Sequence, residues 1–263
     1  MSSDCREEWY DEKSKTAITI VDVSGAAQRL ADGHLCGPTS ARFLAEGLAE
    51  VALIAGELER SEETVSLQMK CKGPLKGMNV EISGDGKLRG YTEKKLLDEF
   101  DGMGRADARK VVGEKQLQVT RSVPGRILSQ AIATNINGYL NQSLQRNASI
   151  KVWADAGDDG KVSGARGVMV EKLPDAEEKE IKWPVKLNLQ AASRTILKAL
   201  GYAHAELKRT TPLKFGCRCS MERAKAMLGA LSDEERKTLP GTVDVTCHMC
   251  GRTYMVPTKE GKV

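Results

Sequence analysis

Four cysteines near the end of the chain are the residues best suited to chemistry. They form two close pairs, Cys217 with Cys219 and Cys247 with Cys250, separated by the 27 residues 220–246. Structural zinc sites commonly use four cysteine thiolates arranged as a tetrahedron. A one-residue gap in an extended segment places both side chains on one side, and a two-residue gap lets both sulfurs face one ion. We therefore predict that these four cysteines hold one zinc ion.

Two residues beside the second pair have separate expected roles. Gly251 allows the tight turn that a zinc-knuckle sequence needs after its last ligand. His248 lies between the two cysteines of the pair, where it would be a redundant fifth ligand. We therefore expect His248 to be exposed to solvent or to support a ligand.

The paired cysteines also indicate sensitivity to oxidation. Each pair is close enough to oxidise within itself, and a bridge across a single residue has poor geometry and is easily reduced. Metal binding can contribute roughly 10–16 kcal/mol to a small zinc fold, and oxidation would remove that contribution by consuming the ligands. A purely structural zinc site is the simpler alternative.

Three further cysteines lie outside this cluster. Cys71 ends an apolar strand face and is expected in the core, while Cys5 lies in an expected N-terminal tail. Cys36 precedes a helix N-terminus, which would lower its pKa, and His34 is two residues away. A Cys36–His34 catalytic dyad is therefore an alternative site, although no third orienting group is evident.

Composition places the chain among soluble globular proteins. Hydrophobic residues make up 40% and charged residues 29% of the 263 residues, and the formal net charge of +4 does not require a nucleic-acid partner. No apolar run approaches the roughly 18 residues that a membrane span needs. The odd cysteine count and an N-terminus without an apolar signal core predict a cytoplasmic protein with no membrane partner.

Residues 1–174 are expected to form an α/β core domain in an α+β fold. After a mobile tail over 1–15, a unit of strand, long helix and strands is expected twice, with a loop over 101–116. The helices are predicted from about Pro38 to Glu59 and along Ile132 to Leu144. Strands are predicted at 16–21, 64–71, 78–82, 87–91, 117–120, 126–128, 149–153 and 168–173.

The rest of the chain divides into a linker and a small domain. Residues 175–212 begin with a charged run and continue as a helix from Leu187 to Leu207, whose apolar face must dock on the core or leave the helix marginally folded. Residues 213–263 are too few for a large core, so this domain needs an added cross-link to stay folded. Two short helices are expected there, over 221–231 and from Ser232.

At this point the residues resemble a known family. The cysteine pattern, with Phe215 before it and Tyr254 after it, is similar to that of the heat shock protein 33 family of redox-regulated holdase chaperones. The segments 72–74 and 84–91, the latter ending in Arg-Gly-Tyr, also match, as does the Leu-Pro pair at 173–174. The resemblance covers nearly the whole chain.

The resemblance implies a mechanism and a set of partners. In the reduced state the four cysteines would hold zinc and the protein would be inactive. Oxidative stress would join Cys217 to Cys219 and Cys247 to Cys250, release zinc and unfold the linker. The protein would then form a homodimer and hold unfolding client proteins without ATP, as a binding protein and not an enzyme.

The chain departs from the family pattern in three segments, 102–104, 122–125 and 166–171. These departures concern the expected dimer and client surfaces and leave the cysteines unchanged.

Two other functions remain as alternatives. A zinc-ribbon nucleic-acid-binding protein would bind RNA or DNA in a salt-sensitive way, but the basic residues of the last domain are interleaved with acids and have little aromatic surface beside them. A thiol–disulfide oxidoreductase using Cys247 and Cys250 lacks the expected strand–CxxC–helix arrangement.

Overall fold

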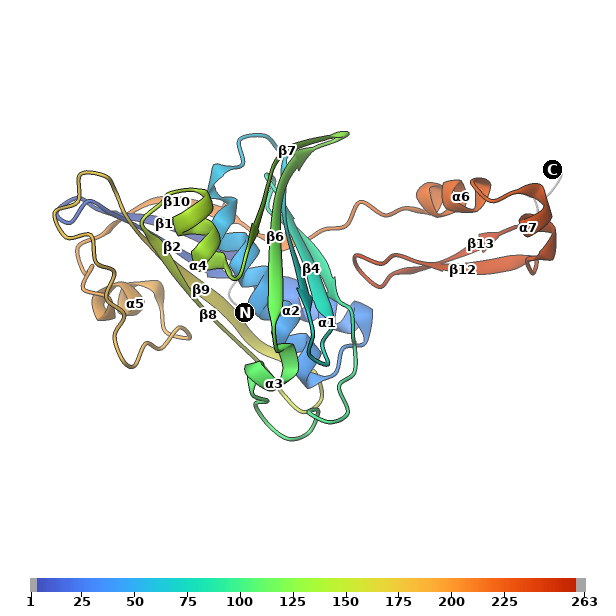
Figure 1. The fold of residues 1–263 in the computed structure, drawn as a ribbon, viewed down its shortest axis with the longest axis horizontal. Coiled ribbons are helices and arrows are strands. Elements are labelled where there is room, and N and C mark those ends of the chain that lie inside the picture. The colour runs from blue at the N-terminus through green and yellow to red at the C-terminus, as the bar shows by residue number, and fades with distance from the viewer. Residues whose placement is uncertain (1–3, 259–263) are drawn as a thin grey trace.

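Two β-sheets with a helix between them form the larger part of the structure, a computed structural model that describes residues 4–258 (Figure 1). The first sheet has the strand order β10-β1-β2-β9-β8, and every neighbouring pair is antiparallel. Its strands are β1 (Cys5–Asp11), β2 (Thr16–Asp22), β8 (Ala148–Ala156), β9 (Val162–Lys172) and β10 (Glu206–Pro212).

The second sheet has the order β11-β5-β4-β3-β6-β7. Strand β11 runs parallel to β5, and the other pairs are antiparallel. The strands are β3 (Thr64–Cys71), β4 (Gly77–Ser83), β5 (Lys87–Thr92), β6 (Lys115–Val123), β7 (Arg126–Ala133) and β11 (Lys214–Phe215). Because β11 follows the linker, the chain leaves the core along the edge of β5.

Helix α2 (Pro38–Leu53) lies between the two sheets and is buried on nearly every side. Apolar residues cover most of the helix, which is typical of a helix enclosed in a core, and the charged residues Arg42, Glu46 and Glu50 recur every four residues along one side. Pro38 occupies its first turn, where a missing amide hydrogen has no cost. Helix α1 (Ser24–His34) packs beside α2 through Ala26, Ala27 and Leu30, and a 3-10 turn (Ile54–Glu57) follows α2.

The outer face of the first sheet is covered by the linker. Helix α5 (Ser193–Ala199) places Ile196 and Leu197, both almost fully buried, against this face. Together with the sheet they form a second apolar cluster of Trp9, Ile18, Ile20, Val168, Val170, Leu189, Ile196, Leu197 and Ala205. The first sheet is therefore apolar on both faces, with α2 on one and the linker on the other.

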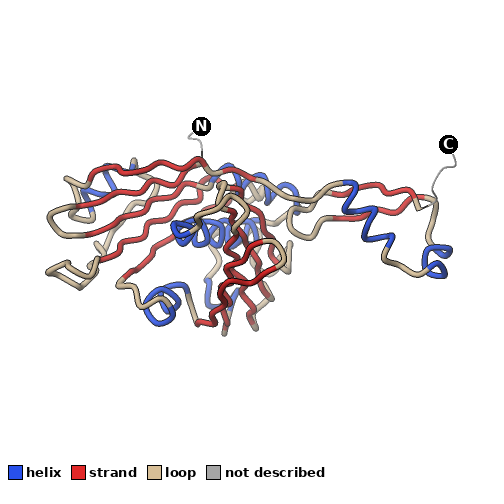
Figure 2. Tube along the Cα trace, turned by 90° about the horizontal axis from the view of Figure 1, so that it is seen from above, coloured by secondary structure: helices blue, strands red, loops and turns tan. Residues whose placement is uncertain are grey.

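The C-terminal residues form an arm that extends away from the core (Figures 1 and 2). It contains α6 (Met221–Gly229), α7 (Asp233–Thr238) and the hairpin of β12 (Thr242–Thr246) and β13 (Thr253–Pro257). The turn of this hairpin points back to the core. The mixed α+β class is as predicted, with few helices and three sheets among residues 4–258.

Several predicted elements are wrong, each because a distant partner decides the conformation. The expected N-terminal tail forms β1, which pairs on both sides with β2 and β10. The first long helix begins at Pro38 as predicted, as α2, but it ends at Leu53 and not near Glu59, and the separate helix α1 before it was not predicted. The expected loop at 101–116 contains the short helix α3 (Ala108–Val112), and the strands at 117 and 126 extend into the β6–β7 hairpin.

The second long helix is confirmed only in its second half, over residues 136–143. Residues up to Ala133 belong to β7, and only a short helix α4 (Ile136–Gly138) and one π turn (Tyr139–Ser143) follow. The linker helix is confirmed only over Ser193–Ala199, because Gly201 (φ +87°) breaks it and residues from Glu206 join the first sheet as β10. The second unit of the predicted repeat therefore has a short helical segment in place of a long helix.

Candidate metal centre

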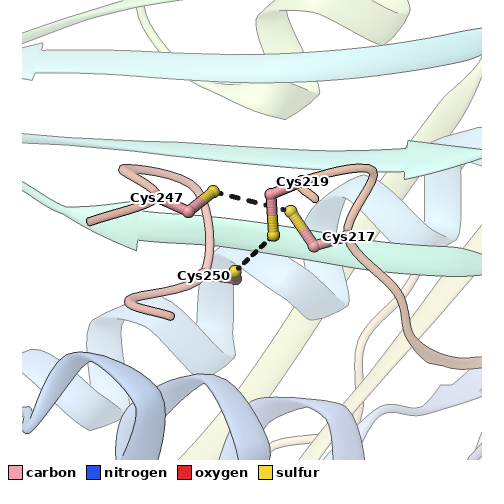
Figure 3. Close-up of side chains that lie close together, drawn as sticks. All are labelled: Cys217, Cys219, Cys247 and Cys250. Carbon is pink, nitrogen blue, oxygen red and sulfur yellow. Dashed lines mark hydrogen bonds between the residues drawn. The ribbon is translucent and has the colours of Figure 1, made fainter. Parts of the chain in front are cut away.

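The four clustered cysteines come from two segments that meet at the base of the arm. Cys217 and Cys219 follow β11 in an extended stretch, after which Ser220 caps α6 by accepting from the Arg223 amide. Cys247 and Cys250 lie in the turn between β12 and β13. Figure 3 shows the four sulfurs converging from these two segments.

The turn that carries the second pair has the geometry of a zinc knuckle, and we call Cys247–Gly251 the knuckle. The Cys247 carbonyl accepts from the amides of Cys250 (3.3 Å) and Gly251 (2.9 Å). Gly251 has φ +71°, in the left-handed region that glycine adopts without strain. The predicted role of Gly251 is therefore confirmed.

The sulfur positions fit a single tetrahedral ion. All four Sγ atoms lie within 4.8 Å of one another, with Cys217 to Cys247 at 3.7 Å and Cys219 to Cys250 at 3.5 Å. A thiolate tetrahedron with metal–sulfur bonds of about 2.3 Å has sulfur–sulfur edges of roughly 3.8 Å. Disulfide bonds are much shorter, about 2.05 Å. Among the described residues no other group of histidine, cysteine or carboxylate side chains comes together in this way.

Burial and mutual hydrogen bonding shift the pKa values of the Cys217, Cys247 and Cys250 thiols in different directions. Burial acts to raise the pKa of Cys217, but hydrogen bonds from the Cys219 backbone and from the neighbouring thiols outweigh it and lower that pKa to about 7. Burial raises the pKa of Cys247 and, more strongly, that of Cys250. One thiolate thus forms readily, and a cation would be needed to hold all four in the ionised state.

Side chains around the ligand cluster make contacts that the sequence did not predict. Tyr254 donates its hydroxyl hydrogen to Cys219 Sγ at 3.2 Å. Arg218, between the first two cysteines, donates to Glu81 of β4 at 2.8 Å. His248 is exposed, as predicted, and its ring packs edge-on against Tyr91 with centroids 3.9 Å apart. These contacts join residues far apart in sequence, so no local pattern indicated them.

The knuckle and the first cysteine pair lie against the core. The Gly216 amide donates to Leu88 (3.0 Å), and the Gly90 amide donates to the Met249 carbonyl (3.0 Å). His34 makes a 2.9 Å hydrogen bond from Nε2 to the Gly90 carbonyl. Burial lowers the pKa of His34 to about 4, so its ring is neutral at neutral pH. Cys250 is consequently almost fully buried and belongs to the main core cluster.

Within the part of the chain that the structure describes, Cys5, Cys36 and Cys71 join no second group of metal-binding side chains. Cys5 lies in β1 rather than in a tail, and Cys71 is partly buried against the core at the end of β3, as predicted. Burial raises the pKa of Cys36, so the expected lowering by the helix N-terminus is wrong. His34 turns instead to Gly90, and no hydrogen bond within residues 4–258 joins it to Cys36.

The three segments that depart from the family pattern lie away from the sulfurs. Gly102 and Gly104 sit in an open turn with positive φ, and residues 122–125 comprise the half-buried end of β6 and the exposed turn to β7. Residues 166–171 belong to β9 in the middle of the first sheet. Arg166 there pairs with Asp22 of β2 at 2.8 Å.

Comparison with known proteins decides the family. A model of the Hsp33 protein family matches residues 8–257. The chain belongs to the Hsp33 family. The predicted resemblance is therefore confirmed, and with it the prediction of a chaperone that acts on unfolded proteins and is not an enzyme.

Hsp33 relatives from several bacteria are similar along most of the chain. The 33 kDa chaperonin of Thermus thermophilus is 28% identical over 282 residues, covering 93% of this chain and 80% of the relative. Those of Symbiobacterium thermophilum and Deinococcus radiodurans are also 28% identical, covering 93% and 91% of this chain and 90% of each relative.

A solved Hsp33 structure shows the same fold. The crystal structure of the 33 kDa chaperonin of Thermotoga maritima superposes with a TM-score of 0.85 over 98% of this chain and 96% of that chain. At 20% identity this likeness supports the fold and not a detailed function. Within residues 4–258 no helix is long and apolar enough to cross a membrane.

Proposed function

We propose that this protein is a redox-regulated, ATP-independent holdase of the cytoplasm that binds unfolding proteins during oxidative stress. In the reduced state Cys217, Cys219, Cys247 and Cys250 hold one zinc ion and the chaperone is inactive. The observation that carries the proposal is the cluster of four sulfurs within 4.8 Å of one another at the base of a weakly packed arm. The donor set fits zinc because zinc favours tetrahedral thiolate sites.

The arm has too few buried apolar side chains to stay folded without a bound metal. Within the described residues after position 212, the buried hydrophobic side chains are Leu213, Ala224, Cys250 and Val256. Folds of this size are commonly unfolded without their metal, since binding free energy is part of their folding free energy. Loss of the ligands is therefore expected to unfold the arm.

Oxidation supplies the trigger. With hydrogen peroxide as oxidant, each pair of zinc-bound thiolates gives up two electrons, and the peroxide takes up these electrons and two protons from solvent to become two water molecules. The products are the disulfides Cys217–Cys219 and Cys247–Cys250. A disulfide no longer provides thiolates, so zinc leaves.

Unfolding then spreads to the linker and uncovers a client surface. Strand β10 is continuous with β11 through Leu213, so the arm and the linker share one stretch of chain. Helix α5 is only seven residues long and is too short to persist without its docking surface. Its release would expose the apolar outer face of Trp9, Ile18, Ile20, Val168 and Val170. Such surfaces bind unfolded chains, and we propose that the oxidised protein also forms a homodimer.

A client-aggregation assay tests the proposal. A thermally unfolding client is followed by light scattering with the reduced zinc-loaded protein and with the oxidised zinc-free protein. The oxidised form should suppress scattering without ATP, the reduced form should not, and dithiothreitol with zinc should reverse the difference. Equal inactivity of both forms would rule the proposal out.

A further inference from the structure

The backbone of the knuckle touches the backbone at the end of α1, at Gly251 and Gly33. A Cβ atom on Gly251 would overlap the Gly33 carbonyl oxygen, and a Cβ atom on Gly33 would lie 2.6 Å from the Cys250 carbonyl oxygen. Real Cβ atoms do not approach other atoms this closely. The contact therefore requires glycine on both sides, one in the core and one in the metal centre.

A second backbone contact fixes the knuckle beside the first. Strand β11 covers the edge of β5 only as far as Leu88, and the next free amide on that edge, Gly90, donates to Met249 in the knuckle. The Gly90 carbonyl accepts from His34, the last residue of α1. Helix α1 and strand β5 thus form one docking surface, defined by Gly33, His34 and Gly90.

The knuckle conformation that docks is also the conformation that presents the sulfurs. Gly251 and the Met249 carbonyl reach the core only because the turn is closed by the hydrogen bonds from Cys250 and Gly251 to Cys247. The same turn aims the two sulfurs of the knuckle at those of the first pair. Docking of the knuckle on the core and binding of a metal by its cysteines need the same conformation. Each must therefore strengthen the other, and the coupling is reciprocal.

Building on the proposed zinc site, we propose that Gly33 is a positioning residue of the metal centre. The docking surface of Gly33, His34 and Gly90 holds the knuckle in its metal-binding conformation, so the core raises the affinity for zinc and zinc strengthens docking. The opposite face of α1 packs in the main core through Ala26, Ala27 and Leu30. Loosening of the core by heat would therefore lower zinc affinity before any thiol is oxidised.

The substitution Gly33→Ala separates this role from a structural one. Gly33 lies inside α1, where alanine favours helix more than glycine does, so the variant should keep or raise the thermal stability of the core. The added Cβ meets the Cys250 carbonyl and should push the knuckle out of place. Gly229→Ala is the matched control, because that helical glycine is on the arm and has no atom within 4 Å of an added Cβ.

Zinc affinity of the full-length variants is measured by competition with a colorimetric chelator. Gly33→Ala should weaken zinc binding by about tenfold or more, as outer-shell changes at metal sites do, whereas Gly229→Ala should match the wild type. Equal affinities in all three proteins would overturn the inference and leave the proposed function standing. Failure of the wild type to bind zinc would remove the proposed function as well.

Hydrogen exchange of the wild-type protein gives a second readout that needs no variant. The Gly90 amide should be protected in the zinc-loaded protein and exchange at least tenfold faster after chelation, while the Val80 amide within the sheet should be unchanged. Continued protection of Gly90 without zinc would show that docking does not depend on the metal. That result would overturn the coupling even if Gly33→Ala failed to fold.

Discussion

Arg218, the residue between the first two cysteines, donates to the Glu81 carboxylate at 2.8 Å across the boundary between arm and core. Glu81 also accepts two hydrogen bonds from Arg89 Nη2 and one from Arg89 Nε, at 2.7–3.0 Å. The Glu81 and Arg89 side chains are each only 15% exposed, whereas Arg218 is 45% exposed. Glu81 therefore binds both Arg89 of the core and Arg218 of the metal centre. Its contact with Arg89 has more hydrogen bonds and is more buried than its contact with Arg218.

We predict that removing Arg218 lowers the free energy of unfolding less than removing Glu81. Arg218→Ala should cost less than about 1 kcal/mol, because exposed ion pairs contribute little. Glu81→Ala should cost about 2–3 kcal/mol, because it leaves the largely buried Arg89 without its partner. Urea unfolding of the two variants, with Lys87→Ala as an exposed ion-pair control, measures the difference. The reverse order of the two costs would contradict the assignment.

Removing one cysteine pair should remove the metal altogether. The double variant Cys217→Ser, Cys219→Ser leaves two thiolate donors, too few for a stable tetrahedral site. Elemental analysis should find one zinc per wild-type chain and none per variant chain. Cys71→Ser, on β3 away from the cluster, is the matched control and should keep its zinc. Full zinc occupancy in the double variant would show that the four cysteines do not share one ion.

Weakening the linker should activate the chaperone without oxidation. Leu197 is fully buried between α5 and the first sheet, so Leu197→Ala should destabilise that contact by about 2–4 kcal/mol. The reduced, zinc-loaded variant should then suppress client aggregation and be cleaved faster by protease between residues 175 and 205. Val185→Ala changes a fully exposed linker side chain and should behave as wild type. A reduced Leu197→Ala protein that is open to protease yet inactive would argue against the linker-covered face as the client surface.

A partly buried carboxyl group on α2 should make the free energy of unfolding depend on pH. Glu50 of α2 lines a cavity of about 260 Å³ with Phe43, Met69 and Met78, and burial raises its pKa from 4.5 to about 7. The folded state holds this proton more tightly than the unfolded state. Glu50 therefore does not lower the free energy of unfolding below pH 4.5. As the pH rises to 7 it lowers the free energy of unfolding progressively, by about 3 kcal/mol at pH 7.

Glu50→Gln should accordingly be more stable than its parent at pH 8 and nearly equal to it at pH 4.5. Both proteins are compared by urea unfolding in the Cys217→Ser, Cys219→Ser background, so that metal release does not contribute. Glu99→Gln, at an exposed position, should show no such pH-dependent gain. A gain for Glu50→Gln that is the same at both pH values would contradict the burial of an ionisable group here.

The sequence by itself determined the elements and ligands that depend on near neighbours. The alternation over 64–91 predicted the strands β3, β4 and β5, because a strand with one buried face repeats every two residues. The cysteine spacings predicted a four-thiol site, because each pair is fixed by its own short turn or extended stretch. Gly251 was predicted from its place after the pair.

Only the tertiary structure decided what depends on distant partners. Charged β1 is a strand because β2 and β10 supply its hydrogen bonds, and residues 206–212 join the same sheet instead of continuing a helix. Apolar residues at 132–144 fit a helical period, yet pairing with β6 takes those up to Ala133. The contact of Gly33 with Gly251 joins residues 218 positions apart, a separation that no local pattern spans. Hydrogen bonding and packing between remote segments outweigh local preference, and at this protein's metal centre they decide where the knuckle lies.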